Sequence, residues 1–254
     1  MKLTILGCGT SSGVPRIGGD WGACDPAEPR NRRRRVSILV EHGGTRVLVD
    51  TGPDLREQLI DVGIAHLDAV IWTHDHADHC HGIDDLRQVF HARQSPVPGF
   101  ARPETLRVLR SRFGYVFEGN DGYPPTVTAA ELPDRLQVGA IAIRIVDQPH
   151  GNVTSAGIRF DAGGRSVAYS TDASGLIDAM TALFAGLDVW VVDALRRRPH
   201  PSHASLSEAL GWIETVGPKR ALLTHMDQSM DYRQLAAELP PGVEPAYDGQ
   251  EISL

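Results

Sequence analysis

The sequence predicts an α/β protein in which two mixed β-sheets pack together with helices outside them, an αββα sandwich. Short strand-like runs lead in each half of the chain and helix-like segments follow them, which is the order expected of such layers. Apolar residues make up 41% of the chain and charged residues 22%, as is typical of a globular protein with a buried core. The chain has 254 residues, a length compatible with one domain over residues 1–254.

The first half begins with a strand-like run and a hairpin that turns around residues 42–44. The first helix-like segment ends at Gly63, because glycine readily adopts the backbone conformation of a helix C-cap. A later helix is opened by Pro103 and is expected to close at Gly114. In chain order we expect a strand at 3–7, a hairpin at 36–50, a helix at 54–63, a strand at 69–73, helices at 83–93 and 103–114, and a loop at 119–126.

The second half of the chain repeats this order. Strand-like runs lie at 140–146, 155–160, 165–171, 188–194 and 220–224, helices at 205–217 and 231–239, and a last strand or two within 243–254. Polar residues fall where strands of both halves end, and strand ends can meet at one rim of a sandwich to form a single site. These residues are Asp50, His74, His150, Asp172, Asp193 and His225.

Four of the eleven histidines and two aspartates fall within the ten residues THDHADHCHG at 73–82. His74 and His76 alternate along an extended segment and can bind one ion, whereas Asp78 and His79 follow on the next turn and can face a second. Zinc, manganese and iron all accept imidazole and carboxylate ligands. A single histidine here is better explained as a solvated helix cap, but the whole string directly after a buried strand indicates a metal site.

This string resembles the signature of the metallo-β-lactamase superfamily, and further motifs of that family follow in order along nearly the whole chain. They are Asp50-Thr51-Gly52, THDHADH, QPHGN around His150, STDASG around Asp172 and LLTHMD around His225. The resemblance implies a binuclear centre of two divalent ions, zinc or manganese, with iron also compatible, and a metal-bridging hydroxide as the nucleophile. It assigns His74, His76 and His150 to one metal, Asp78, His79 and His225 to the other, and Asp172 to the bridging position. Asp78 is thereby counted among the catalytic residues as well, and Asp50 is expected to orient ligands rather than bind metal.

The ligand set leaves several branches of the superfamily open. β-Lactamases carry a cysteine at the position of Asp172, whereas glyoxalase-like thioesterases share all seven ligands. The segments GCGTSSGVP and VVDALRRRPHPSHASLSEAL are similar to segments of the phosphoribosyl 1,2-cyclic phosphodiesterases and of the tRNA 3′-processing endonucleases. In the second segment His203 matches the general acid of those phosphodiesterases, and Asp193 lies where the endonucleases carry an acidic partner for it. His200 is the alternative proton donor.

The phosphoribosyl cyclic phosphodiesterase group is the better match, with one departure. Its members hold a structural zinc in a cysteine-rich loop, but here Cys24 is the only cysteine of that loop, and Gly19 and Trp21 occupy the other positions. The distant histidine ligand of that zinc is also replaced, near Gln228. Because one thiol does not hold a structural zinc, Cys24 is expected to be a free thiol.

The function expected from these motifs is hydrolysis of a small cyclic, ribosyl or nucleotide phosphodiester. An endonuclease would need an arm for the tRNA body, and no long glycine- and proline-rich insertion is visible between residues 150 and 210. The net charge of −7 also argues against a large nucleic acid as partner. A non-catalytic scaffold that only holds metal is the weakest alternative, because none of the seven ligands is lost.

Cellular location and partners are less strongly indicated. The three cysteines are scattered and odd in number, which favours a reducing cytoplasm over a disulfide framework. No apolar run approaches eighteen residues, so no membrane segment is expected. A homodimer is compatible with the sequence. The arginines of the clusters Arg32–Arg35 and Arg196–Arg198 either lie exposed to solvent or bind phosphate, and the sequence leaves both interpretations open.

Overall fold

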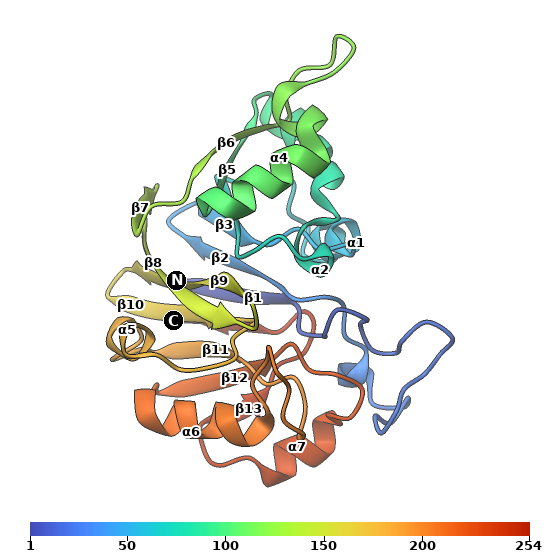
Figure 1. Ribbon diagram of the computed structural model, residues 1–254, viewed down its shortest axis with the longest axis vertical. Coiled ribbons are helices and arrows are strands. Elements are labelled where there is room, and N and C mark those ends of the chain that lie inside the picture. The colour runs from blue at the N-terminus through green and yellow to red at the C-terminus, as the bar shows by residue number, and fades with distance from the viewer.

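Two seven-stranded β-sheets form the centre of the computed structural model, which describes residues 1–254 (Figure 1). The first sheet contains, in spatial order, β14 (Glu251–Ser253), β1 (Lys2–Gly7), β2 (Ser37–His42), β3 (Thr45–Val49), β4 (Ala69–Trp72), β5 (Val97–Ala101) and β6 (Val127–Glu131). The second contains β13 (Val243–Pro245), β12 (Arg220–Thr224), β11 (Val189–Asp193), β10 (Arg165–Ser170), β9 (Val153–Ala162), β8 (Ile141–His150) and β7 (Arg135–Val138).

Both sheets are mixed, which confirms the predicted fold class. In the first sheet β1, β2 and β3 pair antiparallel, whereas β3 to β6 run parallel. In the second sheet β7 to β10 pair antiparallel, whereas β10 to β13 run parallel. Parallel neighbours present their carboxyl ends at the same edge, so β3 and β4 in one sheet, and β10, β11 and β12 in the other, each end at a common rim.

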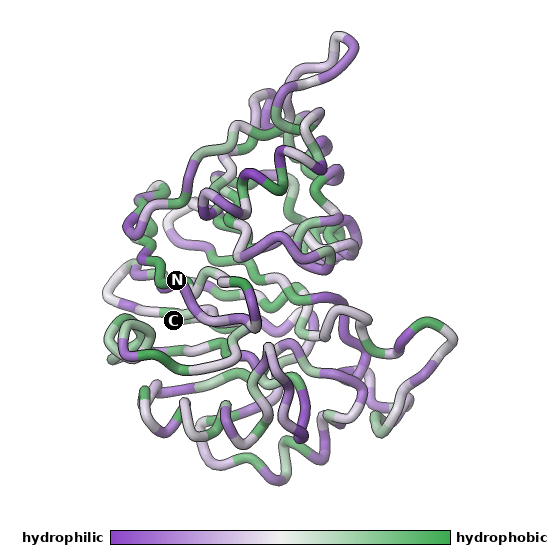
Figure 2. The backbone as a smooth tube through the Cα atoms, viewed as in Figure 1, coloured by the Kyte–Doolittle hydropathy of each residue, from purple (hydrophilic) through white to green (hydrophobic).

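Side-chain alternation along the strands builds two cores. In β2, Ile38 and Val40 belong to the larger core of 43 buried residues, to which both sheets contribute. Leu39, between them in the chain, points to the opposite face and joins a second core of 18 buried residues. This period of two is the geometry of a strand buried on both sides. Figure 2 shows the resulting pattern, with hydrophobic residues along the strands and hydrophilic residues in the loops.

Helices cover the outer faces of both sheets. Helix α4 lies over the first sheet, and α6 and α7 lie beneath the second (Figure 1). Leu106 and Leu109 of α4 pack into the 18-residue core, and Ala209 and Ile213 of α6 into the 43-residue core. The helices are α1 (Leu55–Asp61), α2 (Ala77–Cys80), α3 (Leu86–Arg93), α4 (Pro103–Glu118), α5 (Asp178–Leu183), α6 (Leu206–Val216) and α7 (Tyr232–Glu238), with 3-10 turns η1 (Pro29–Asn31) and η2 (Ile83–Asp85). None of them combines the length and apolar character needed to cross a bilayer.

The predicted end of one helix is wrong. Helix α4 does not close at Gly114 but continues to Glu118, with a local departure from helical geometry at Phe113 (φ −127°, ψ 36°). It stops at Gly119, whose φ of +76° suits glycine, and the N–H of Gly119 donates to the carbonyl oxygen of Tyr115 at 3.0 Å.

Several short elements have no counterpart in the sequence-based expectation, among them β5, β6, β7 and α5. The sequence of β5, VPGFA, contains proline and glycine, which argue against a strand in isolation. It forms because β4 and β6 flank it on both sides in parallel register. The pairing partner, rather than the local sequence, decides this element.

Candidate metal centre and active site

The predicted site residues gather at the rim where the parallel strands of both sheets end. Asp50 follows β3 and His74 follows β4 in the first sheet, while Asp172 follows β10 and His225 follows β12 in the second. His150 is the last residue of β8. Residues from the first sheet and residues from the second sheet, which are far apart in the chain, therefore meet at one edge of the sandwich.

Backbone strain is concentrated in this rim. Five non-glycine residues have positive φ, and three of them are Asp50 (64°), Asp172 (53°) and His225 (59°). Such a conformation costs on the order of 1–3 kcal/mol per residue and persists only where surrounding contacts enforce it. For Asp172 one of those contacts is the hydroxyl of Ser155, which donates to its carbonyl oxygen at 2.7 Å.

The first group of potential metal ligands consists of His74, His76, His150 and Asp172, whose ligand atoms all lie within 4.8 Å of one another. His150 Nε2 is 3.2 Å from His76 Nδ1. The Oδ2 atom of Asp172 lies 3.4 Å from His150 Nε2 and 3.6 Å from His74 Nε2. These distances leave room for an ion between the four side chains, with ligand types that suit zinc or manganese.

The second group consists of Asp78, His79 and His225. Asp78 Oδ2 lies 3.4 Å from His79 Nε2 and 3.5 Å from His225 Nε2. The other carboxylate oxygen of Asp172, Oδ1, lies 3.2 Å from His79 Nε2 and 3.4 Å from His225 Nε2. The two oxygens of Asp172 therefore face different histidine groups, which is the geometry a bridging carboxylate requires.

Hydrogen bonds from the surrounding structure determine which ring nitrogens are free. His150 Nδ1 lies 2.7 Å from the carbonyl oxygen of Ser202, and His79 Nδ1 lies 2.7 Å from Asp50 Oδ2. Both partners accept only, so each Nδ1 donates, and in the neutral ring each Nε2 keeps a lone pair for the site. The hydroxyl of Thr73 donates to Asp50 and therefore accepts from His74 Nδ1, at 3.0 Å. Nε2 of His74 is thus also left free for the site.

The free nitrogens face one another and the carboxylates without a donor between them. The Nε2 atoms of His74, His79 and His225 are buried and have no hydrogen-bond partner. Buried polar atoms are almost always paired, so unpaired nitrogen atoms that converge on carboxylate oxygens are the arrangement expected of a cation-binding site. Divalent cations in the two groups would satisfy these atoms, and the residues present fit such ions.

The electrostatics of the rim point the same way. Burial lowers the pKa of His79, but the carboxylates of Asp172 and Asp78 outweigh it and raise this pKa well above its usual range. For His225 burial is likewise outweighed, chiefly by Asp172, and the pKa rises to about 9. Burial raises the pKa of Asp172, yet His225 and His79 hold it well below its usual range. The centre thus stabilises positive charge placed among its histidines.

His203 and Asp193 form a pair beside the centre. Asp193 is fully buried, and its Oδ2 accepts from His203 Nδ1 at 2.9 Å and from the N–H of Ala173 at 3.0 Å. With Nδ1 engaged, Nε2 of His203 is directed at the centre, 3.8 Å from Asp172 Oδ2. The His203 ring stacks on that of His225 with centroids 4.6 Å apart.

His200 has a different environment. Its Nδ1 accepts from the N–H of Ser202 at 3.3 Å, and its ring lies 5.1 Å from that of His203. Burial, followed by repulsion from His203, lowers the pKa of His200. Of the two histidines in this loop, His203 is the one within reach of the Asp172 carboxylate.

Cys24 lies next to a buried arginine. The thiol is free, and burial raises its pKa. Arg33 is 2% exposed and donates from Nη2 to the carbonyl oxygen of Met230 at 2.6 Å and from Nη1 to that of Asp227 at 3.3 Å, with Cys24 Sγ 3.9 Å from Nη1. The guanidinium therefore ties the loop around Cys24 to the segment that follows His225.

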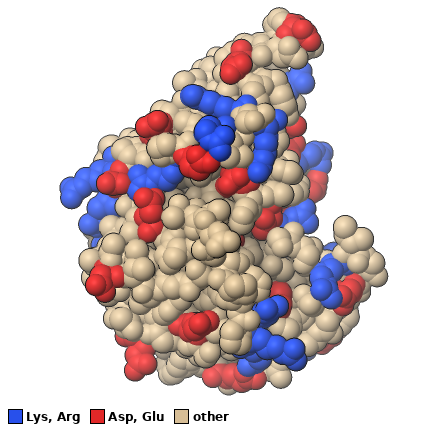
Figure 3. Space-filling view, in the orientation of Figure 1, with Lys and Arg blue, Asp and Glu red and all other residues tan.

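The arginine clusters do not form single patches. Arg33 is buried, Arg34 pairs with Asp61, and Arg32 lies over the ring of Trp21 at 5.3 Å. In the second cluster Arg197 pairs with Glu238 at 2.7 Å, and Arg196 donates to the carbonyl oxygen of Pro199. Figure 3 shows cationic and acidic side chains interspersed over one face of the molecule.

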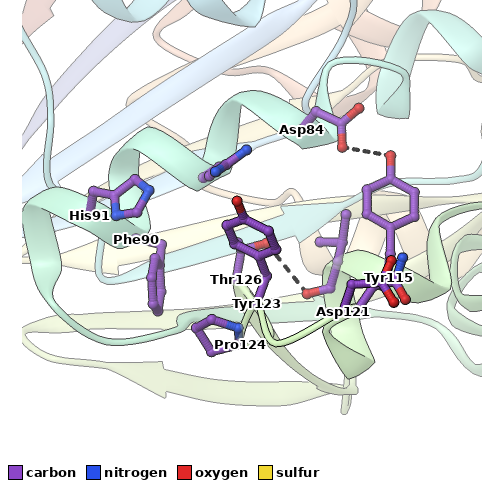
Figure 4. A pocket seen from close by; sticks show the side chains of 11 residues that line it. Asp84, Phe90, His91, Tyr115, Asp121, Tyr123, Pro124 and Thr126 are labelled. Carbon is purple, nitrogen blue, oxygen red and sulfur yellow. Dashed lines mark hydrogen bonds between the residues drawn. The ribbon is translucent and has the colours of Figure 1, made fainter.

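A separate pocket lies between α3, the end of α4 and the loop at 119–126 (Figure 4). Phe90 and Tyr123 line it, and the hydroxyl of Tyr115 donates to Asp84 Oδ1 at 2.6 Å. None of the seven predicted ligands contributes to this pocket. The chemistry-bearing side chains lie at the strand rim instead.

Sequence reasoning missed three groups that position the site: the hydroxyl of Thr73, the carbonyl oxygen of Ser202 and the guanidinium of Arg33. Thr73 adjoins the histidine string, and its position was a usable signal. Ser202 acts through its backbone carbonyl oxygen, and Arg33 acts through a contact with Met230, almost 200 residues away in the chain. No local sequence pattern predicts either contact.

Residues 45–226, more than half of the chain, match the family model of the β-lactamase superfamily domain. The chain belongs to the metallo-β-lactamase superfamily. This confirms the resemblance drawn from the histidine string and the motifs that follow it.

Individual members of the superfamily are similar over most of the chain. A solved structure of a new diphosphatase from the PhnP family is 36% identical, with a TM-score of 0.91, and the match covers 99% of this chain and 96% of that one. Ribonuclease Z of Mycobacterium bovis is 28% identical, covering 93% of this chain and 92% of its own length. An octanoyltransferase of Porphyromonas gingivalis is 33% identical over 99% of this chain, which spans only 51% of that relative.

Proposed function

We propose that this chain is a binuclear metal-dependent phosphodiesterase that acts on a small cyclic, ribosyl or nucleotide phosphodiester. The observation that carries the proposal is the division of the Asp172 carboxylate. One oxygen faces His74 and His150, and the other faces His79 and His225. A carboxylate in that position would hold two cations at once, one through each oxygen.

The charges of the site agree with two divalent ions. Asp78 and Asp172 contribute a carboxylate each within the site, and Asp50 one directly behind it. Together with one hydroxide, these three carboxylates would balance the four positive charges of two such ions, which satisfies the requirement that buried charges be paired. Zinc and manganese both suit these ligands, and iron is compatible as well.

The residues have distinct roles in this proposal. One ion would be held by His74, His76 and His150. The other ion would be held by Asp78, His79 and His225, and Asp172 would lie between the two ions. Two divalent ions bound there supply water activated for nucleophilic attack and neutralise charge on the phosphoryl group. His203 donates a proton from Nε2 to the leaving oxygen, and Asp193 holds its ring in that orientation through Nδ1.

A phosphate ester is favoured over a thioester for two reasons. The PhnP-family diphosphatase and the ribonuclease Z relatives are named for action on phosphate linkages. A phosphodiester also leaves as an alkoxide, which benefits from the proton donor that the His203–Asp193 pair provides. The name octanoyltransferase belongs to a protein about twice as long as this chain, and acyl transfer is not carried over from it.

A tRNA-processing endonuclease is the second candidate, because the ribonuclease Z of Mycobacterium bovis matches over nearly its whole length. The net charge of −7 and the interspersed charges in Figure 3 speak against a long RNA ligand, whose binding depends on clustered cations.

The test compares three substrates with the protein loaded with zinc or with manganese. Bis-(p-nitrophenyl) phosphate should be hydrolysed with a higher kcat/KM than a glutathione thioester, and a precursor tRNA should remain uncleaved at its 3′ end. Elemental analysis of the same preparations should find two metals per chain. Faster turnover of the thioester than of any phosphodiester would overturn the proposal, and tRNA cleavage would favour the second candidate.

A further inference from the structure

Four buried polar side chains form a hydrogen-bonded network next to Asp172. They come from three neighbouring strands and the residue that follows them: Gln148 in β8, Ser155 in β9, Ser170 in β10 and Thr171 directly after β10. Each of the four residues is at most 1% exposed. Burying a polar group costs free energy unless the group is hydrogen-bonded, so the partners of these four groups show what the network holds in place.

Gln148 is the centre of this network, because its amide makes three hydrogen bonds. Nε2 donates to Ser155 Oγ at 2.9 Å and to the carbonyl oxygen of Thr171, and Oε1 accepts from the hydroxyl of Ser170 at 2.8 Å. The carbonyl oxygen can only accept, so it fixes which end of the amide carries the nitrogen. A Cβ atom placed on Gly157 would lie 2.6 Å from Oε1, so only glycine leaves room for the amide there.

The network fixes the backbone on both sides of Asp172. The angles φ and ψ of Asp172 are rotations between the peptide group that carries the Thr171 carbonyl and the peptide group that carries its own carbonyl. Gln148 holds the first group directly. It holds the second through Ser155, whose hydroxyl accepts from Gln148 and donates to the Asp172 carbonyl oxygen at 2.7 Å. With both groups held, a non-glycine residue keeps a φ of 53° that is otherwise unfavourable.

The carboxylate of Asp172 is also oriented by this segment. The hydroxyl of Thr171 donates to Asp172 Oδ1 at 2.7 Å. Oδ1 is the oxygen that faces His79 and His225, so this bond fixes the side chain as the network fixes the backbone. The direction of both carboxylate oxygens therefore depends on hydrogen bonds that lie outside the seven ligands.

We propose that Gln148 is a positioning residue for the bridging carboxylate and that it allows two ions to bind at the same time. The inference rests on the proposed binuclear centre and adds to it a residue that acts only through Asp172. A single ion needs one oxygen of Asp172, and a carboxylate that is free to turn can supply it. Two ions need both oxygens in fixed directions. Loss of the network should therefore weaken binding of the second ion much more than binding of the first.

The experiment titrates the metal-depleted full chain with Mn²⁺ and records bound metal and the EPR spectrum. Isolated Mn²⁺ ions give a resolved hyperfine spectrum, whereas two Mn²⁺ ions bridged by one carboxylate are exchange-coupled and give a different one. The wild type should bind two Mn²⁺ ions and show the coupled spectrum. Gln148→Met keeps the side-chain volume without the hydrogen bonds; it should raise the Kd of the second ion about 10- to 100-fold and that of the first by less than about threefold.

Ile145→Val is the matched control. It removes a methyl group from the 43-residue core in the same strand and leaves the network intact, so both Kd values should equal those of the wild type even though stability falls. Ser155→Ala removes one of the two links from Gln148 to the backbone of Asp172 and should raise the Kd of the second ion by a smaller factor, about 3- to 10-fold. This milder variant decides the question if Gln148→Met does not fold.

Equal weakening of both ions in Gln148→Met would overturn the proposal, because a merely structural role has that effect. An unchanged second Kd, with the coupled spectrum retained, would overturn it as well, and in Ser155→Ala the same result would do so if Gln148→Met does not fold. A wild type that binds a single Mn²⁺ ion and never shows exchange coupling would instead refute the binuclear centre itself, so the two failures differ.

Discussion

Replacing His203 with alanine should separate proton donation from substrate binding. The structure fixes Nδ1 on Asp193 at 2.9 Å and leaves Nε2 as the ring nitrogen that faces the centre, 3.8 Å from Asp172 Oδ2. A leaving oxygen held beside that carboxylate is within hydrogen-bond reach of Nε2. An in-line displacement places the leaving oxygen opposite the nucleophile, so the donor has to come from outside the ligand set.

The expected loss depends on the leaving group. Removal of a general acid typically costs about 10²- to 10⁴-fold in rate, or about 2.7–5.4 kcal/mol at 1.36 kcal/mol per factor of ten. A nucleoside 2′,3′-cyclic phosphodiester, which leaves as an alkoxide, should lose this much in His203→Ala. Bis-(p-nitrophenyl) phosphate should lose less than about 10-fold, because p-nitrophenolate departs without protonation.

The assay is kcat for both substrates together with metal content by elemental analysis. Both metals should remain, since the seven ligands are unchanged. His203→Asn, whose amide can still donate to the buried Asp193, controls for the hydrogen bond that alanine removes from that carboxylate. Equal losses on both substrates, in both variants, would show that His203 binds substrate rather than donating a proton. Loss of a metal would show that His203 is a ligand.

Three further predictions concern metal content and stability. Asp172→Ala should release at least one metal because no other side chain spans both groups, whereas His81→Ala, at an exposed position, should retain both; elemental analysis decides. Cys24→Ser should leave metal content unchanged and lower the unfolding free energy by less than about 1 kcal/mol in urea titrations, because Arg33 keeps its hydrogen bonds to the carbonyl oxygens of Met230 and Asp227. Burial raises the pKa of Asp248 from 3.8 to about 7, so its folded form binds a proton more tightly than its unfolded form. The protonated carboxyl therefore stabilises the fold fully below about pH 4, and this stabilisation is lost as the pH rises to about 7. Between pH 4 and pH 7 the unfolding free energy of the wild type, relative to that of Asp248→Asn, should fall by about 1.4 kcal/mol per pH unit.

The elements that the sequence predicted well are runs of apolar residues bounded by turn residues. The run at 36–50 contains two such stretches, β2 and β3, and the turn at 42–44 lets them pair, so the hairpin follows from local pattern alone. The predicted end of α4 was wrong because Gly114 is tolerated within the helix, while Gly119, with its positive φ, ends it. Strand β5 was missed because its register depends on the strands beside it.

The sequence by itself determined the fold class, the superfamily and the histidine string, because strand periodicity and ligand spacing are local properties. Only the tertiary structure decided how that string meets the rest of the site. His74 lies at the end of a strand in one sheet, and Asp172 and His225 lie at strand ends in the other. The way the two Asp172 oxygens diverge depends on the packing of one sheet against the other and on a left-handed backbone at that residue. Contacts between residues about 100 positions apart are set by that packing, and no short stretch of the chain encodes them.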